Sequence, residues 1–134
     1  LGKLGNGHTI NLINNFFAMT TANAMAEAFA TADAAGIDRQ ALYSVMSAGP
    51  LKSGMMDFIR NYAVDGQVDL AFSVANAAKD VGYYRQMAGD LGLESRMSTA
   101  ADATLREARD GGDGGIMVPE MVDWMAKHLG SKQS

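Results

Sequence analysis

Apolar residues recur along this chain at the three- and four-residue intervals of an α-helix, most clearly between Thr9 and Ala35. That stretch holds no Pro and no Gly, and Ala is abundant in it. Residues at positions i, i+4, i+7 and i+11 of one face are Leu12, Phe16, Met19 and Asn23. A helix of this length would span ~40 Å at about 1.5 Å per residue. We therefore predict a long first helix that needs partners on several sides and ends at Gly36.

Five shorter helical patterns follow the first. They cover about 39–47, 51–63, 72–90 and 97–109, with a last helix that starts near Pro119. Asp38 is a suitable N-cap for the first of them, and the Gly-rich segment 110–115 is predicted to be a loop. Further positions expected to face inward are Val45, Met97, Met121, Met125 and Leu129. The pattern predicts an all-α fold of about six helices around the long first one, as a single domain over residues 1–134.

Composition narrows the possible functions. The 134 residues are 48% hydrophobic and 19% charged, which is typical of a globular domain and argues against a disordered chain or a membrane span. Cysteine is absent, so disulfides and thiolate chemistry are excluded, and a cytoplasmic location is expected. Basic residues are scattered and the net charge is -4, which argues against nucleic-acid binding. His8 and His128 lie at opposite ends of the chain, so we expect no metal site. The first residue is Leu1, and we expect a fragment of a longer protein.

The glycines of segment 2–7 superficially resemble a dinucleotide-binding loop. That loop follows a β-strand and has the order G-x-G-x-x-G, which lets backbone amides meet a pyrophosphate at a helix N-terminus. Here the spacing is reversed and no strand pattern precedes it. The segment is instead interpreted as a flexible entry into the long helix.

Three asparagines follow this segment on one flank of the predicted helix: Asn11, Asn14 and Asn15. Asn is a mediocre helix former because its side chain competes for backbone hydrogen bonds. Periodicity alone favours a solvated flank, and a polar site is the other interpretation.

The spacing of these residues resembles a known signature. Gly2, Gly5, Gly7, Asn14 and Asn15 match the pattern G-x-x-G-x-G-x-x-x-K-x-x-N-N that opens the C-terminal domain of the β-hydroxyacid dehydrogenases. That family includes 3-hydroxyisobutyrate dehydrogenase and tartronate semialdehyde reductase. One position departs from the pattern, because Asn11 stands where the family has its catalytic Lys. The resemblance implies a substrate-binding role for Asn14 and Asn15.

The resemblance continues along nearly the whole chain. Segments 26–28 and 34–38 resemble the family's AEA…AGLD run, and Gly112-Asp113 resembles a G-D loop. Phe72 with Lys79-Asp80 resembles the family's F-x6-K-D element, which implies that these three residues face the cofactor. Without the family, Lys79 would be interpreted as a solvated helix residue and Phe72 as core.

Several expectations follow from the resemblance. The fold would be that of the C-terminal domain of the 6-phosphogluconate dehydrogenase superfamily, and the parent protein would carry a separate N-terminal Rossmann domain. NAD or NADP would be the cofactor, a small 3-hydroxy acid or semialdehyde the substrate, and a homodimer or higher homo-oligomer the assembly. The isolated chain would be inactive. The alternatives are a non-catalytic helical dimerisation module and a relative similar to imine reductases.

Asn11 leaves the chemistry open. A Lys ammonium can stabilise the oxyanion formed in carbonyl reduction and donate a proton to it, whereas Asn offers only a neutral N–H. Three explanations stand side by side. In the first, the proton comes from another group, for which His8, one turn before Asn11, is a less favoured candidate. In the second, the protein is a catalytically weak homologue that binds a cofactor or a partner. In the third, the substitution is engineered or incidental.

Overall fold

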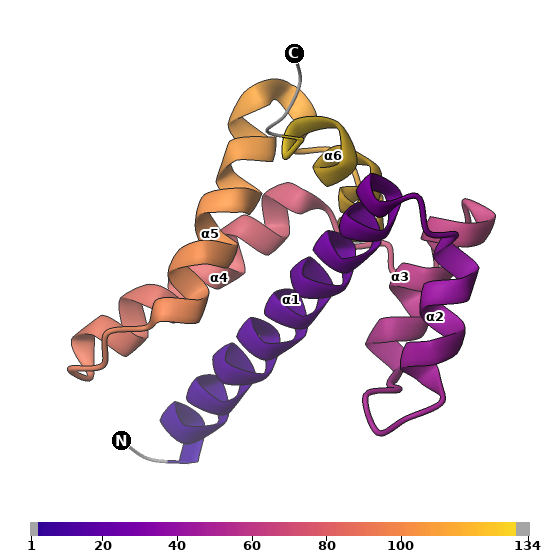
Figure 1. Ribbon diagram of the computed structural model, residues 1–134. Helices are drawn as coiled ribbons and strands as arrows, with labels where there is room; N and C mark the ends of the chain where they lie inside the picture. The colour runs from indigo at the N-terminus through magenta and orange to yellow at the C-terminus, as the bar shows by residue number, and fades with distance from the viewer. Residues whose placement is uncertain (1–2, 131–134) are drawn as a thin grey trace. The chain divides into compact units, whose positions relative to one another are not determined.

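The computed structural model describes residues 3–130 and is all-α there, with six α-helices and no strand (Figure 1). This confirms the fold class predicted from periodicity. The α-helices are α1 (Lys3–Ala35), α2 (Arg39–Ser47), α3 (Gly54–Asp65), α4 (Val74–Asp90), α5 (Arg96–Ala108) and α6 (Met121–His128). A π-helical turn, η1 (Arg109–Asp113), and a 3-10 turn, η2 (Val118–Glu120), lie between the last two. None of the helices in the described residues is long and apolar enough to cross a membrane.

Short polar side chains set where the helices begin. Asp38 accepts a hydrogen bond from the backbone N–H of Ala41 at 3.1 Å, which caps α2 as predicted. Ser53, Ser73 and Ser95 cap the next three helices in the same way. Gly36 follows α1 with φ 72°, a left-handed conformation that glycine adopts without a steric penalty.

The observed helix starts correct three predicted boundaries. Helix α1 starts at Lys3, so the glycines from Gly5 onward are helical and do not form a flexible entry, whereas Gly2 lies outside the described residues. Ser53 delays the third helix to Gly54. Ser73 delays the fourth to Val74, which leaves Phe72 before the helix, so it shares no helix face with Lys79.

The chain divides into two compact units, with the change from one to the other inside α1. The first unit contains residues 1–20 and 72–115, and the second contains residues 21–71 and 116–134. In the first unit, α4 and α5 pack against each other (Figure 1). The carboxylate of Asp102 on α5, 3% exposed, joins them by accepting a hydrogen bond from Arg85 of α4 at 2.7 Å, and it forms an ion pair with Arg106 at 3.1 Å. A buried carboxylate is tolerated here because two guanidinium groups compensate its charge.

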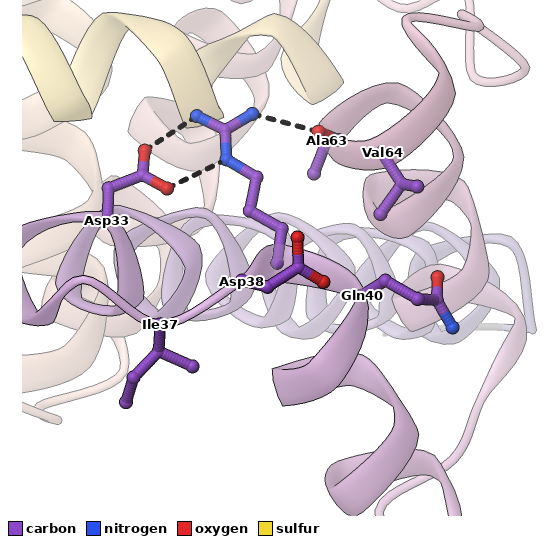
Figure 2. Close-up of a pocket in the computed structure, with 7 residues that line it drawn as sticks. Asp33, Ile37, Asp38, Gln40, Ala63 and Val64 are labelled. Carbon is purple, nitrogen blue, oxygen red and sulfur yellow. Dashed lines mark hydrogen bonds and ion pairs between the residues drawn. The ribbon is translucent and has the colours of Figure 1, made fainter.

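In the second unit, Arg39 at the start of α2 ties four elements together. Its guanidinium donates to Asp33 of α1 at 2.7 and 3.0 Å, to the carbonyl of Ala63 in α3 at 2.9 Å, and to Asp123 of α6 at 3.0 Å. Figure 2 shows Asp33 and Ala63 converging on this group beside a shallow pocket. The hydrogen bond to Asp33 is the main reason why the pKa of Arg39 is raised.

Asp123 of this network also binds Tyr62, whose hydroxyl donates to it at 2.7 Å. The carboxylate raises the pKa of Tyr62 from 10.0 to about 12, because ionising the phenol would break this bond and place two negative charges together. The stabilisation from this pair is therefore complete below pH 10, and it is lost as the pH rises towards 12.

Not every predicted core position is buried. Met121 and Met125 are buried as predicted, whereas Met97 is 63% exposed and Val45 and Leu129 are also exposed. Met97 lies in the first turn of α5, before the buried face of that helix begins at Ser98. The predicted loop 110–115 begins instead as the π-helical turn η1, with Gly112 at φ 102°.

Candidate functional site

All six residues that the sequence marks as a candidate site lie in the first compact unit. Three are on α1, one precedes α4 and two are on α4. They are Asn11, Asn14, Asn15, Phe72, Lys79 and Asp80. Their placement is therefore decided by how the first half of α1 packs on α4.

Helices α1 and α4 run antiparallel in this unit (Figure 1). The ring of Phe16 stacks on the ring of Tyr84 with centroids 4.0 Å apart and planes inclined by 4°. Earlier residues of α1 face later residues of α4, which fixes the opposite directions of the two helices. Phe16 and Leu12 belong to the apolar face predicted for the long helix, and Tyr84 is buried. Their contact sets the position of α1 along α4.

A groove of about 370 Å³ lies between these two helices. Its apolar part includes Leu12, Met87 and Leu91, and its polar groups come from His8 and Thr9 on α1 and from Tyr83, Gln86 and Asp90 on α4. Small-ligand pockets commonly combine an apolar lining with a few polar groups and have volumes of about 300–1,000 Å³. The groove falls within that range and is open to solvent.

Helical spacing extends the α1 wall of the groove. His8 lines the groove, and Asn11 and Asn15 follow it at i+3 and i+7 on the same face of α1. Asn11 is exposed and Asn15 is half-buried. The continuation of this wall therefore carries two of the three predicted amides.

The opposite wall extends in the same way. Tyr83, Gln86 and Asp90 line the groove, and Lys79 precedes them on the same face of α4, at i−4 from Tyr83. Because the helices are antiparallel, Lys79 lies towards the end of the groove that Asn15 approaches. Asn11, Asn15 and Lys79 therefore do not line the groove itself but lie beyond its lining residues along the same two helices.

The other three predicted residues are placed differently. Asn14 is exposed, and it is two residues from Leu12, about 200° around the helix, so it points away from α4. Phe72 lies before the N-cap Ser73, and it is half-buried. Asp80 is half-buried on α4, at i−4 from Tyr84, which stacks on Phe16, and at i−3 from Tyr83, which lines the groove.

The side chains on the groove walls are free to meet a ligand. No hydrogen bond or ion pair within residues 3–130 involves the side chain of Asn11, Asn15 or Lys79. An exposed ammonium and an amide are each suited to bind a carboxylate or the hydroxyl of a small acid. The described part of the chain has no strand-to-helix glycine turn. That part also has no cluster of three metal-ligating side chains.

Sequence reasoning missed the α4 wall of the groove. Tyr83 and Asp90 are separated from Lys79 by 4 and 11 residues, a helical spacing that was visible along the chain. The spacing alone does not single them out, because which face of α4 meets α1 depends on tertiary packing.

Comparison with known proteins identifies the family to which this chain belongs. The model of the family described as NAD-binding of NADP-dependent 3-hydroxyisobutyrate dehydrogenase matches residues 5–125. The chain belongs to this family. The match spans the groove and continues through most of the second compact unit, in agreement with the resemblance inferred from the glycine and asparagine spacing.

A solved structure shows the same fold. A 3-hydroxyisobutyrate dehydrogenase from Salmonella typhimurium is similar to this chain with a TM-score of 0.78 and 25% sequence identity. The similarity covers 87% of this chain and 41% of that one, so the chain spans about two fifths of the length of its relative. A search of curated protein sequences gave no match.

Proposed function

We propose that this chain is the substrate-binding half of an NAD(P)-dependent oxidoreductase that interconverts a small 3-hydroxy acid and its semialdehyde. Membership of the 3-hydroxyisobutyrate dehydrogenase family supports this class of reaction. The observation that carries the proposal is the groove between α1 and α4, whose walls are extended by Asn11, Asn15 and Lys79. This chain covers 41% of the solved relative. In this proposal the full-length protein also carries a nucleotide-binding domain, in the part of the relative's length that this chain does not cover.

Each wall has a part in this function. Lys79 binds the carboxylate of the substrate or an anionic group of the cofactor, since it is exposed and has no partner within the described residues. Asn15 orients the reacting hydroxyl or carbonyl group by hydrogen bonds. A nicotinamide, when bound, supplies or accepts the hydride. Asn14, Phe72 and Asp80, which the resemblance implies as further contacts, are not among the residues that line the groove.

Hydride transfer by the full-length protein tests the proposal. NADH and NADPH absorbance would be followed with small semialdehydes, 3-hydroxy acids and cyclic imines, for the natural protein and for Asn11→Lys. We expect turnover of a semialdehyde or 3-hydroxy acid and none by the 134-residue chain alone, which holds no dinucleotide-binding turn in its described residues. Preference for a cyclic imine would favour an imine-reductase-like activity. Silence of both full-length forms would leave a non-catalytic helical module.

We also infer that α1 contributes to pairing with a second copy of the chain. Ile10, Ile13 and Phe17 form an apolar stripe at i, i+3 and i+7 with 65%, 47% and 70% of their surfaces exposed. A helix that is apolar on most sides is normally buried, and the stripe is exposed in the part of the chain that the structure describes. A two-fold interface buries the same surface patch on both subunits. The stripe on α1 could therefore pair with the same stripe on a second copy.

The effect of Phe17→Glu tests this pairing. Burying a carboxylate without a partner is costly, so the variant is expected to shift the protein from dimer to monomer by at least about tenfold in dissociation constant. Light scattering after size-exclusion chromatography over a concentration series would measure it. Leu93→Glu is the matched control, because Leu93 is 58% exposed on the turn after α4 and does not belong to the stripe. Equal masses for both variants at every concentration would contradict the pairing.

A further inference from the structure

We propose that the acid bound at this site is an elongated one, with its carboxylate at Lys79, an apolar chain along the groove between α1 and α4, and a positively charged end at Asp90. This inference rests on the proposed function and names the class of its substrate. It starts from the separation between two parts of the site. Asn15 and Lys79 lie beyond one end of the groove, whereas Asp90 lines the other end.

The groove begins where these two polar residues end. Tyr83, the first residue of α4 that lines it, follows Lys79 by one helical turn. On the opposite side, Leu12 of α1 lines the groove and precedes Asn15 by three residues. From Lys79 to Asp90 the helix rises about 16 Å, at about 1.5 Å per residue. The flexible stem of Lys79 lets its ammonium meet a carboxylate near the groove, and a chain longer than that of a four-carbon acid is needed to reach Asp90.

The lining of the groove suits a hydrocarbon chain. Its apolar side chains are Leu12 on α1 and Met87 and Leu91 on α4. Leu12 is 7% exposed and belongs to a packed wall, whereas Leu91 is 69% exposed. A chain lying in this groove of about 370 Å³ would remove apolar surface from water, which favours binding.

The end of the groove that is remote from Lys79 is negatively charged. Asp90 is the last residue of α4, and no ion pair within residues 5–130 involves its carboxylate. The C-terminal end of a helix carries a partial negative charge, and in the 17-residue α4 this adds to the charge of Asp90. His8 and Thr9 line the α1 side of this end and offer further hydrogen-bonding groups. The two ends of the site therefore have opposite charges, which is complementary to a ligand with an anion at one end and a cation at the other.

Binding to the full-length protein tests the length of the ligand. Isothermal titration calorimetry would compare 3-hydroxybutanoate with 3-hydroxyoctanoate, in the presence of the reduced nicotinamide cofactor so that a hydroxy acid does not react. We expect the dissociation constant to fall about two- to fourfold for each added methylene, which corresponds to half to full burial of a CH2 group. Equal dissociation constants for the two acids would overturn the inference.

A pair of variants locates the apolar chain. Leu91→Asn should weaken binding of 3-hydroxyoctanoate and leave that of 3-hydroxybutanoate unchanged, so the short acid reports on the integrity of the fold. Leu93→Asn is the matched control, because Leu93 is also exposed on the turn after α4 but does not line the groove. The same loss of affinity for both acids in Leu91→Asn, or for the longer acid in both variants, would contradict this placement.

A further comparison tests the charged end. The ω-amino derivative of 3-hydroxyoctanoate should bind about two- to fivefold more tightly than 3-hydroxyoctanoate, as expected for an exposed ion pair. Asp90→Asn should abolish this advantage, whereas Glu107→Gln, which removes an exposed carboxylate of α5 outside the groove, should preserve it. An amino derivative without an advantage in the natural protein, or with one that survives Asp90→Asn, would overturn the inference.

The outcomes separate this inference from the proposed function. If the full-length protein transfers hydride with four-carbon substrates and chain length changes neither binding nor turnover, the elongated substrate is wrong and the proposed function stands. If no acid of either length binds and no hydride is transferred, both proposals fail.

Discussion

Replacing Arg39 with Ala is expected to destabilise the chain by about 2–3 kcal/mol, a large effect for a single substitution outside the apolar core. Arg39 has a side chain only 22% exposed and bonds Asp33, Asp123 and the carbonyl of Ala63. Its loss leaves two carboxylates close together and a part-buried carbonyl without a donor. Hydrogen bonds to charged groups contribute about 1.5–3 kcal/mol, and the exposure of both carboxylates lowers the expected total.

Urea unfolding of the chain, followed by circular dichroism, measures this effect. Arg39→Lys should recover only part of the loss, because one ammonium cannot reproduce the planar arrangement of donors that reaches three partners. Arg109→Ala is the control: Arg109 pairs with its neighbour Asp110 at the surface, and the change should stay within about 0.5 kcal/mol. Equal unfolding free energies for the Arg39 and Arg109 variants would show that the network does not stabilise the second unit.

The helices could be predicted from the sequence because their signals are local. The helical spacing of Leu12, Phe16 and Met19 predicted the inward face of α1, and Asp38 predicted the start of α2. Ser53 and Ser73 are equally local signals, and they correct the predicted starts of α3 and α4 by a few residues. Met97 shows where the pattern fails, since an apolar residue in the first turn of a helix need not reach the core.

The candidate site was only partly predictable, since it depends on how α1 and α4, which are far apart in the sequence, pack against each other. The family signature marked Asn11, Asn15 and Lys79 one by one, and no local signal showed that they extend opposite walls of one groove. That arrangement follows from the stacking of Phe16 on Tyr84. The signature also marked Phe72 and Asp80, and these stay predictions: the cap at Ser73 leaves Phe72 before α4, and Asp80 is half-buried on that helix.

Replacing Lys79 with Ala in the full-length protein is expected to weaken binding of the anionic ligand ~10–10²-fold. Truncating one partner of a charge-assisted hydrogen bond costs about 1.5–3 kcal/mol, which is that range of fold-changes. Stability should change by less than about 0.5 kcal/mol, because Lys79 is exposed and bonds no residue of the described chain. The expected result is therefore a higher KM or dissociation constant in a protein that unfolds normally.

Three comparisons make the Lys79 experiment specific. Lys79→Arg keeps the positive charge and should keep most of the affinity, whereas Lys127→Ala removes an exposed lysine from α6 in the other unit and should change nothing. Raising the salt concentration should weaken ligand binding in the natural protein more than in Lys79→Ala, because the charge that salt screens is gone from the variant. A helical interaction module has no anionic ligand at this wall, so the same affinity in Lys79→Ala and Lys127→Ala would favour that module over a dehydrogenase half.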